Sequence, residues 1–130
     1  MFVDTSAIIA IICEEEDHAE LLARARLAPQ IVTTPLVVLE GTMRLSTMFK
    51  ESPERSLQVI MDLIGELGGR IVPIEPADGE TAVRAFAEFG KGRGNRARLN
   101  LADCLTYACA KNRALPILYK GADFAATDLA

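Results

Sequence analysis

Several residue types that carry familiar chemistries are scarce in this chain of 130 residues. It has one histidine, His18, in a charged stretch with no nucleophile nearby, which argues against a Ser-His or Cys-His mechanism. Its three cysteines, Cys13, Cys104 and Cys109, are odd in number and lack CxxC spacing. We therefore expect small buried thiols in a reducing, cytoplasmic compartment, and neither a disulfide framework nor a zinc site.

Long apolar runs and targeting segments are missing too. The longest strictly apolar run, residues 7–13, is too short to cross a bilayer, and no basic segment with a small-residue cleavage site precedes it. We therefore expect no membrane span, no signal peptide and no membrane partner. The formal net charge of −4 argues weakly against a nucleic-acid partner, although the local distribution of charge matters more than the sum.

The composition is that of one folded domain spanning residues 1–130. Half of the residues are hydrophobic and a quarter are charged, which excludes a disordered chain. Short apolar strands are expected at 1–3, 30–33, 70–74 and 116–119, and helical stretches separate them. This alternation predicts an α/β fold with a parallel sheet covered on both faces.

Residues 100–110 form the most unusual stretch, because the helix expected there is apolar all round and should be buried. Asp103 lies in its first turn, and a buried carboxylate must find cations, donors or a proton. One explanation is a shortened capping box, with Asn100 as the N-cap and Asp103 at the third helical position. The other is that Asp103 helps to hold a metal ion, which requires further carboxylates at the same point.

Glu40 is the second anomaly. In the helix expected from residue 35 to about 50, Leu36, Leu39 and Met43 form an inward stripe, and Glu40 falls on the same stripe. The structural alternative is a favourable position near the positive end of the helix dipole, although Glu40 already lies past the first turn.

Asp4, Glu40, Asp103 and Asp123 all belong to one edge of the sheet if its crossovers are right-handed. Ligands bind outside this edge in open parallel sheets. Taken singly, each acid has a plain structural explanation; Asp123 and Asp128 could be ordinary turn residues. Together, four carboxylates repel, and without a cation some would take up protons near neutral pH. Oxygen ligands without His or Cys favour Mg²⁺ or Mn²⁺.

Four segments in order resemble the PIN-domain family, and most of all its VapC-type toxins of bacterial toxin–antitoxin pairs. They are residues 2–7 (FVDTSA), Glu40, residues 99–104 (LNLADC), and residues 120–124 (KGADF) followed by Thr127-Asp128. The resemblance implies a three-layer α/β sandwich with a parallel sheet of four or five strands. Because only two residues follow Asp128, we expect little of a last edge strand.

The resemblance also implies an activity, that of a Mg²⁺- or Mn²⁺-dependent endoribonuclease, and a cognate VapB-like antitoxin as partner. It assigns the catalytic and metal-binding roles to Asp4, Glu40, Asp103 and Asp123. The supporting polar positions fall on Ser6, Asn100 and Thr127, with Asp128 as a carboxylate further out.

A basic, glycine-rich segment at residues 90–98 leads directly into the helix of Asp103. It contains no acid, and we expect its four basic residues to bind RNA: Lys91, Arg93, Arg96 and Arg98. The alternative is a solvated flexible loop. The helix expected at 53–67 carries Val59 and Leu63 beyond its main apolar stripe, which together with the resemblance predicts a homodimer.

Other enzyme classes fit less well. A haloacid-dehalogenase-like phosphatase needs a second Asp two residues after the first, where this chain has Ser6, and a receiver-like phosphoacceptor needs an Asp after a middle strand. A dinucleotide-binding fold needs G-x-G-x-x-G after a strand, whereas Gly90, Gly92 and Gly94 follow a helix. A catalytically silent PIN-like module that binds RNA or protein remains the alternative, and a metal-dependence assay on RNA separates the two.

Overall fold

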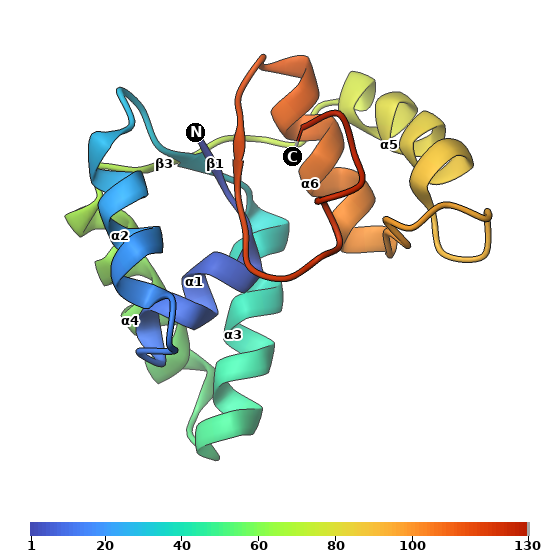
Figure 1. Ribbon diagram of the computed structural model, residues 1–130. Helices are drawn as coiled ribbons and strands as arrows, with labels where there is room; N and C mark the ends of the chain where they lie inside the picture. The colour runs from blue at the N-terminus through green and yellow to red at the C-terminus, as the bar shows by residue number, and fades with distance from the viewer. Residues whose placement is uncertain (130) are drawn as a thin grey trace.

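The computed structural model describes residues 1–129, in which strands and helices alternate as the sequence predicts (Figure 1). The elements are β1 (Phe2–Val3), α1 (Thr5–Ile12), α2 (His18–Leu27), β2 (Val32–Thr33), α3 (Pro35–Phe49), α4 (Pro53–Glu66), β3 (Arg70–Ile71), α5 (Pro76–Phe89), α6 (Leu101–Asn112) and β4 (Ile117–Leu118).

The sheet of this described part is parallel, with four strands in the order β3-β2-β1-β4. Phe2 pairs with Val32 on one side and with Ile117 on the other, so β1 is central. The strands are shorter than the sequence predicts. β1 and β2 end at Val3 and Thr33 as predicted, because Asp4 and Thr34 are the N-caps of α1 and α3. The missing residues lie at the amino ends of these two strands and at the carboxyl end of β3.

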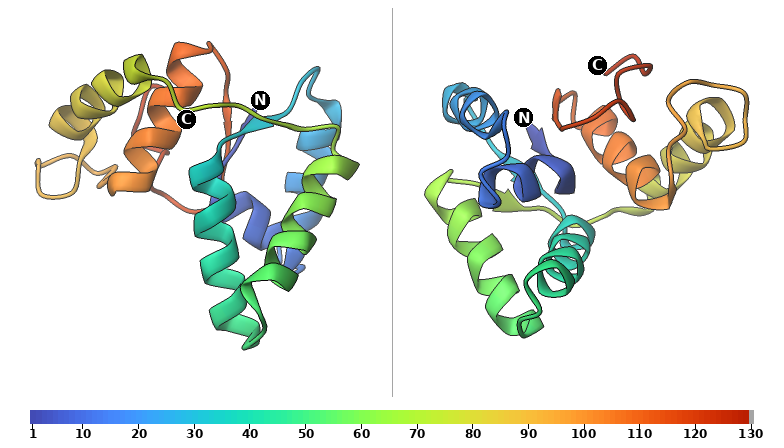
Figure 2. Two further views of the ribbon diagram at one scale, coloured as in Figure 1. Left: turned by 180° about the vertical axis from the view of Figure 1, so that it is seen from behind. Right: turned by 60° about the horizontal axis from the view of Figure 1, so that its bottom comes forward.

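The helices form two layers around the sheet, which confirms the three-layer sandwich. From β1 through β2 to β3 the chain moves in one direction across the sheet, and it then crosses to the far side of β1 to form β4. Right-handed crossovers therefore place α5 and α6 on the face opposite to α1 and α2. Figures 1 and 2 show α5 and α6 side by side, well apart from α2 and α4. The strand order reverses at β1, which marks the ligand-binding edge.

The core lies between β1, α1, α4 and α6, where Phe2, Ile8, Ile60 and Ala108 are fully buried. The expectation that α6 is buried on every side is wrong at its start, because Leu101 is 74% exposed. No helix among residues 1–129 combines the length and apolarity that a membrane crossing requires.

The apolar stripe expected on α3 is also wrong. Leu39 and Met43 are 56% and 61% exposed. The helix instead buries a neighbouring face, made of Val37, Gly41, Thr42 and Leu45. Gly41 explains why this face, and not the predicted stripe, packs against α4. A Cβ placed at Gly41 would lie 2.9 Å from Ile60 Cδ1, so the missing side chain lets α3 approach α4 closely.

Candidate catalytic site

Asp4 is the best-held acid of the predicted set. It follows β1 directly and is 6% exposed. Its Oδ2 accepts hydrogen bonds from the Ser6 amide at 2.9 Å and the Ser6 hydroxyl at 2.6 Å, and its Oδ1 accepts one from Thr106 Oγ1 at 3.1 Å. The carboxylate of Asp4 is thereby the N-cap of α1.

Asp103 belongs to a capping box, as one of the two sequence-based explanations predicts. Its Oδ2 accepts from the Asn100 amide at 2.9 Å, and its own amide donates to Asn100 Oδ1 at 2.9 Å. Burial first, and then the charges of Asp4, Asp123 and Glu40, together raise the pKa of Asp103 to about 6, although the hydrogen bond from Asn100 lowers it. Capping therefore does not exclude a second role, since the other three acids all act on Asp103.

Glu40 is half-buried on α3 and faces the same point. Burial raises its pKa, and so does the charge of Asp4, whereas Arg44 and the nearby Thr5 hydroxyl act in the opposite direction. Thr5 Oγ1 is buried and makes no hydrogen bond of acceptable geometry within residues 1–129. A buried hydroxyl therefore lies beside the acids, close enough to act on Glu40.

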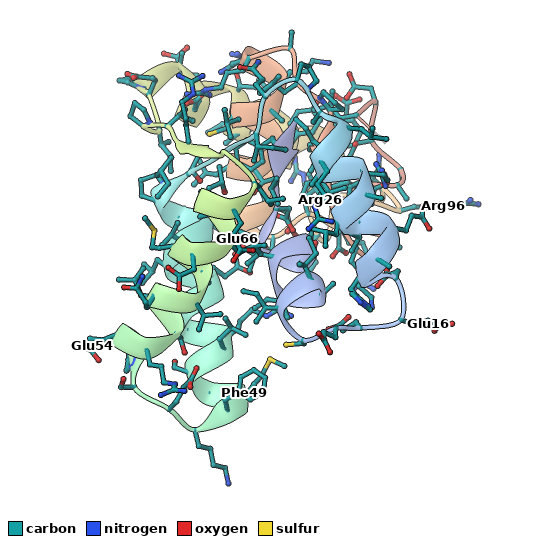
Figure 3. All side chains as sticks on the ribbon, turned by 90° about the vertical axis from the view of Figure 1, so that its left-hand side faces the viewer. Glu16, Arg26, Phe49, Glu54, Glu66 and Arg96 are labelled. Carbon is teal, nitrogen blue, oxygen red and sulfur yellow. The ribbon has the colours of Figure 1, made fainter. Side chains whose placement is uncertain are left out.

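Asp123 follows β4 and shares a hollow of about 270 Å³ with Lys91, Arg98, Asn100 and Asp103. Two of the four basic residues therefore line the acidic site. The other two do not: the guanidinium of Arg93 lies over the Phe86 ring at 5.5 Å, and Arg96 projects from the molecule in Figure 3.

Of the predicted supporting residues Thr127 and Asp128, the first lies in the turn that follows Asp123, and the second lies away from the acidic cluster. Thr127 Oγ1 donates to the Phe124 carbonyl at 2.8 Å and accepts from the Leu129 amide at 3.2 Å, so it shapes the turn that carries Asp123. The structure does not bring Asp128 to the acidic cluster. Its carboxylate accepts from the Tyr107 hydroxyl at 2.7 Å and pairs with Lys111, in a separate hollow against α5.

Thr106 is a site residue that the sequence analysis missed. It contacts Asp4 from α6, three residues after Asp103. That spacing, which places two side chains on one helix face, was the available signal. A second missed contact is the backbone amide of Lys120, which donates to Ser6 Oγ at 3.0 Å and links the β4 turn to α1.

The chemistry of these residues fits a hard divalent cation. The donors around the acids are carboxylate, hydroxyl and amide oxygens, which Mg²⁺ and Mn²⁺ prefer. Within residues 1–129 no three Asp, Glu, His or Cys side chains lie close enough to enclose an ion alone. Mg²⁺ usually keeps several waters and takes one or two carboxylates, so this spacing suits an ion held partly through water. Such an ion would also offset the repulsion that, together with burial, raises the pKa of Asp103.

A parallel sheet with four acids at its switch point is the arrangement expected for a PIN domain. The family model of the PIN domain matches residues 1–129, and the chain belongs to this family. A VapC ribonuclease of Rhizobium meliloti strain 1021 is 38% identical to it, over 98% of both chains. Ribonuclease VapC28 of Mycobacterium tuberculosis is also 38% identical, over 98% of this chain and 93% of the relative.

Solved structures agree with this assignment at the level of the fold. The crystal structure of Mycobacterium tuberculosis VapC20, described as a toxin that cleaves the sarcin-ricin loop, has a TM-score of 0.75 at 16% identity. The match covers 99% of this chain and 95% of that one. A toxin–antitoxin complex from Klebsiella pneumoniae has a TM-score of 0.68 at 18% identity, covering 98% of this chain and 92% of that one.

Proposed function

We propose that this protein is the endoribonuclease toxin of a type II toxin–antitoxin pair. It hydrolyses RNA phosphodiester bonds at Asp4, Glu40, Asp103 and Asp123 with Mg²⁺ or Mn²⁺. The convergence of four carboxylates at the sheet switch point carries the proposal. The charges of Asp4, Asp123 and Glu40 support it, since all three add to the effect of burial in raising the pKa of Asp103. The names of the relatives support the substrate class, since they are VapC ribonucleases.

Each acid has a role that follows from its position. Asp4 and Asp103 would hold the ion, while Glu40 and Asp123 would act through water or orient the attacking water. When bound, the ion supplies a Lewis acid for the scissile phosphate and for the leaving oxygen. Proton transfer would run through a carboxylate or water, because the one histidine, His18, lies at the start of α2 with its Nδ1 2.6 Å from the Glu15 carbonyl.

The RNA backbone approaches over the basic loop. Lys91 and Arg98 line the same hollow as Asp103 and Asp123, so they are placed to contact phosphates next to the scissile one. Arg93 and Arg96 lie further out and contribute to the general attraction of RNA. The chain itself is proposed to form a homodimer and to bind a VapB-like antitoxin, and the solved toxin–antitoxin complex with the same fold supports such a partner.

Cleavage of RNA by the chain free of any partner tests the proposal. We expect cuts with Mg²⁺ or Mn²⁺ and none with EDTA, and sequencing of the new RNA ends gives the cleavage site. Asp4→Asn and Asp103→Asn should each abolish cleavage while the fold persists. Asp62→Asn, which alters an exposed acid of α4 that accepts from Gln58, is the matched control and should cut normally. RNA binding without cutting under any metal would favour the silent binding module instead.

A further inference from the structure

The two oxygens of the Asp4 carboxylate are not equivalent. Oδ2 accepts two hydrogen bonds, from the amide and the hydroxyl of Ser6. A carboxylate oxygen has two lone pairs, so Oδ2 is fully used. The hydroxyl of Ser6 is fixed in turn, because the Lys120 amide donates to Ser6 Oγ and leaves its proton for Asp4. Oδ1 accepts only from Thr106 among residues 1–129 and keeps one lone pair for another ligand.

Thr106 therefore acts on the oxygen through which Asp4 would reach an ion. Its side chain is buried, with Thr106 3% exposed, and the bond to Asp4 spans 102 residues of sequence. Threonine hydroxyls inside helices often bond the carbonyl one turn earlier. Here the hydroxyl leaves its own helix and reaches the end of β1.

Thr106 also links the elements that carry two of the acids. It lies three residues after Asp103 in α6, and residues at this spacing share a helix face. The bond from Thr106 to Asp4 is thus a direct link between the helix that carries Asp103 and the strand end that carries Asp4. Loss of the bond would free Asp4 Oδ1 to shift, while the capping box would still hold Asp103.

We propose that Thr106 is a positioning residue: its hydroxyl fixes Asp4 Oδ1 against Asp103 and so sets the geometry in which the two carboxylates share one ion. This inference rests on the proposed function of the site. It assigns Thr106 no contact with the RNA or with the reacting atoms.

Binding of Mn²⁺ in the absence of RNA is the direct test, with free Mn²⁺ measured by electron paramagnetic resonance. Thr106→Val keeps the shape of the side chain and removes the donor, so we expect Mn²⁺ affinity to fall about tenfold or more. Thr106→Ser keeps the hydroxyl and should restore affinity to within about twofold of the original. Thr106→Ala, which avoids any crowding by the second methyl group, should match Thr106→Val. With RNA, kcat should fall in both donorless variants while KM stays unchanged.

Thr81→Val is the matched control. Thr81 is buried like Thr106, and its hydroxyl donates to Asn112 Oδ1 at 3.0 Å between α5 and α6, outside the acidic site. It should lower thermal stability without changing Mn²⁺ affinity. Equal Mn²⁺ affinity in the original protein and in folded Thr106→Val or Thr106→Ala would overturn the inference alone. If the original protein neither binds Mn²⁺ nor cuts RNA, the proposed function fails and the inference fails with it.

Discussion

The charge of Asp103 lowers the stability of the fold near neutral pH. This residue caps α6, and burial and the neighbouring acids raise its pKa from 3.8 to about 6. Between these two values the folded protein binds more protons at this residue than the unfolded chain does. The free energy of unfolding therefore falls as the pH rises through this window and stays lower above it. A bound cation offsets this cost.

Asp103→Asn should consequently stabilise the metal-free protein while abolishing cleavage. The amide oxygen of asparagine still accepts from the Asn100 backbone, so the cap is retained. At about pH 7.5 we expect the free energy of unfolding in urea to rise by about 1–2 kcal/mol, and near pH 4 by much less. Asp62→Asn, at an exposed position of α4, should change little at either pH. Saturating Mn²⁺ should shrink the gain, and a variant less stable than the original at neutral pH would contradict this account of the site.

The four basic residues of the loop should separate into two pairs. Lys91→Ala/Arg98→Ala removes the pair that lines the acidic hollow, and Arg93→Ala/Arg96→Ala removes the same charge outside it. In an Asp4→Asn background, the first pair should lower the salt dependence of binding to single-stranded RNA by about 1.4 in the log–log slope, or about 0.7 for each phosphate that is no longer neutralised. The second pair should lower it by less than half of that. Equal slopes in the two double variants would show that the loop attracts RNA without a defined binding position.

The sequence could predict that Asp4, Glu40, Asp103 and Asp123 lie near one another, because strand ends and helix starts are local features and parallel topology brings them together. It could not rank the basic residues. Their directions depend on a loop backbone with φ values of 83° at Gly92, 82° at Gly94 and 53° at Arg98, which no periodic pattern encodes. The direction of the Asp128 side chain was not predictable for a similar reason, because it depends on contacts with Tyr107 and Lys111 across the fold.

At the scale of elements, the sequence predicts where helices occur, but it does not predict which face of a helix is buried. Gly41 decides which face of α3 meets α4, and a pattern of large apolar residues alone selects Leu39 and Met43, which are exposed. The carboxyl ends of β1 and β2 were likewise predictable, because the capping residues Asp4 and Thr34 stop these strands, whereas the early end of β3 at Ile71 was not. Packing between helices, rather than hydrophobic periodicity, sets these details.

A buried ion pair joins α5 to the end of α6. Asp78 is buried and accepts from Arg113 Nη1 at 3.0 Å and from Asn112 Nδ2 at 2.9 Å. Arg113 also donates to the Pro73 carbonyl at 2.9 Å, which fixes the segment before α5. Burial alone would raise the pKa of Asp78, but the hydrogen bonds from Arg113, the Glu75 amide and Asn112 hold it below its usual value.

Arg113→Met should therefore destabilise the protein strongly. It leaves Asp78 buried without its cation, and removal of one partner of a buried pair costs about 3–5 kcal/mol. Lys111→Met is the control on the same helix: its pair with Asp128 is exposed and should cost less than about 1 kcal/mol. The stabilisation by Asp78 should persist above pH 3.8 and disappear as the pH falls through its lowered pKa. Equal urea midpoints for the two variants would disprove the role of the pair.

At the scale of the whole molecule, α4 exposes more apolar surface than a covered helix needs. Leu57, Val59 and Met61 are all partly open to solvent along it. We expect a dimer by sedimentation at micromolar concentration, and Val59→Asp should convert it to a monomer because the charge would have to be buried in the interface. Gln58→Glu, at the neighbouring exposed position, tests whether added charge alone has this effect. A monomeric original protein, free of any partner, would refute self-association.

The proposed antitoxin would have two features of this surface to recognise. The first is the acidic site, where an Arg fork would fit between paired carboxylates. The second is an apolar hollow of about 300 Å³ between α3, α4 and β3, lined by Pro35, Val38, Leu39, Thr42, Leu57 and Ile71. Glu40 lies on the same helix as Leu39, so one extended segment can occupy the hollow and reach the acids. We expect the cognate tail to carry apolar residues followed by Arg or Lys.

A competition experiment distinguishes this mode of inhibition from others. An antitoxin peptide is titrated into the nuclease at rising Mn²⁺, with RNA cleavage as the readout. If a basic side chain displaces the ion, the apparent inhibition constant should rise with the Mn²⁺ concentration, and replacement of the basic residues by Gln should remove that dependence. Leu39→Asp in the nuclease should weaken inhibition without changing cleavage, since it alters only the apolar hollow. Inhibition that ignores Mn²⁺ and survives the loss of every basic residue would place the antitoxin elsewhere on the toxin.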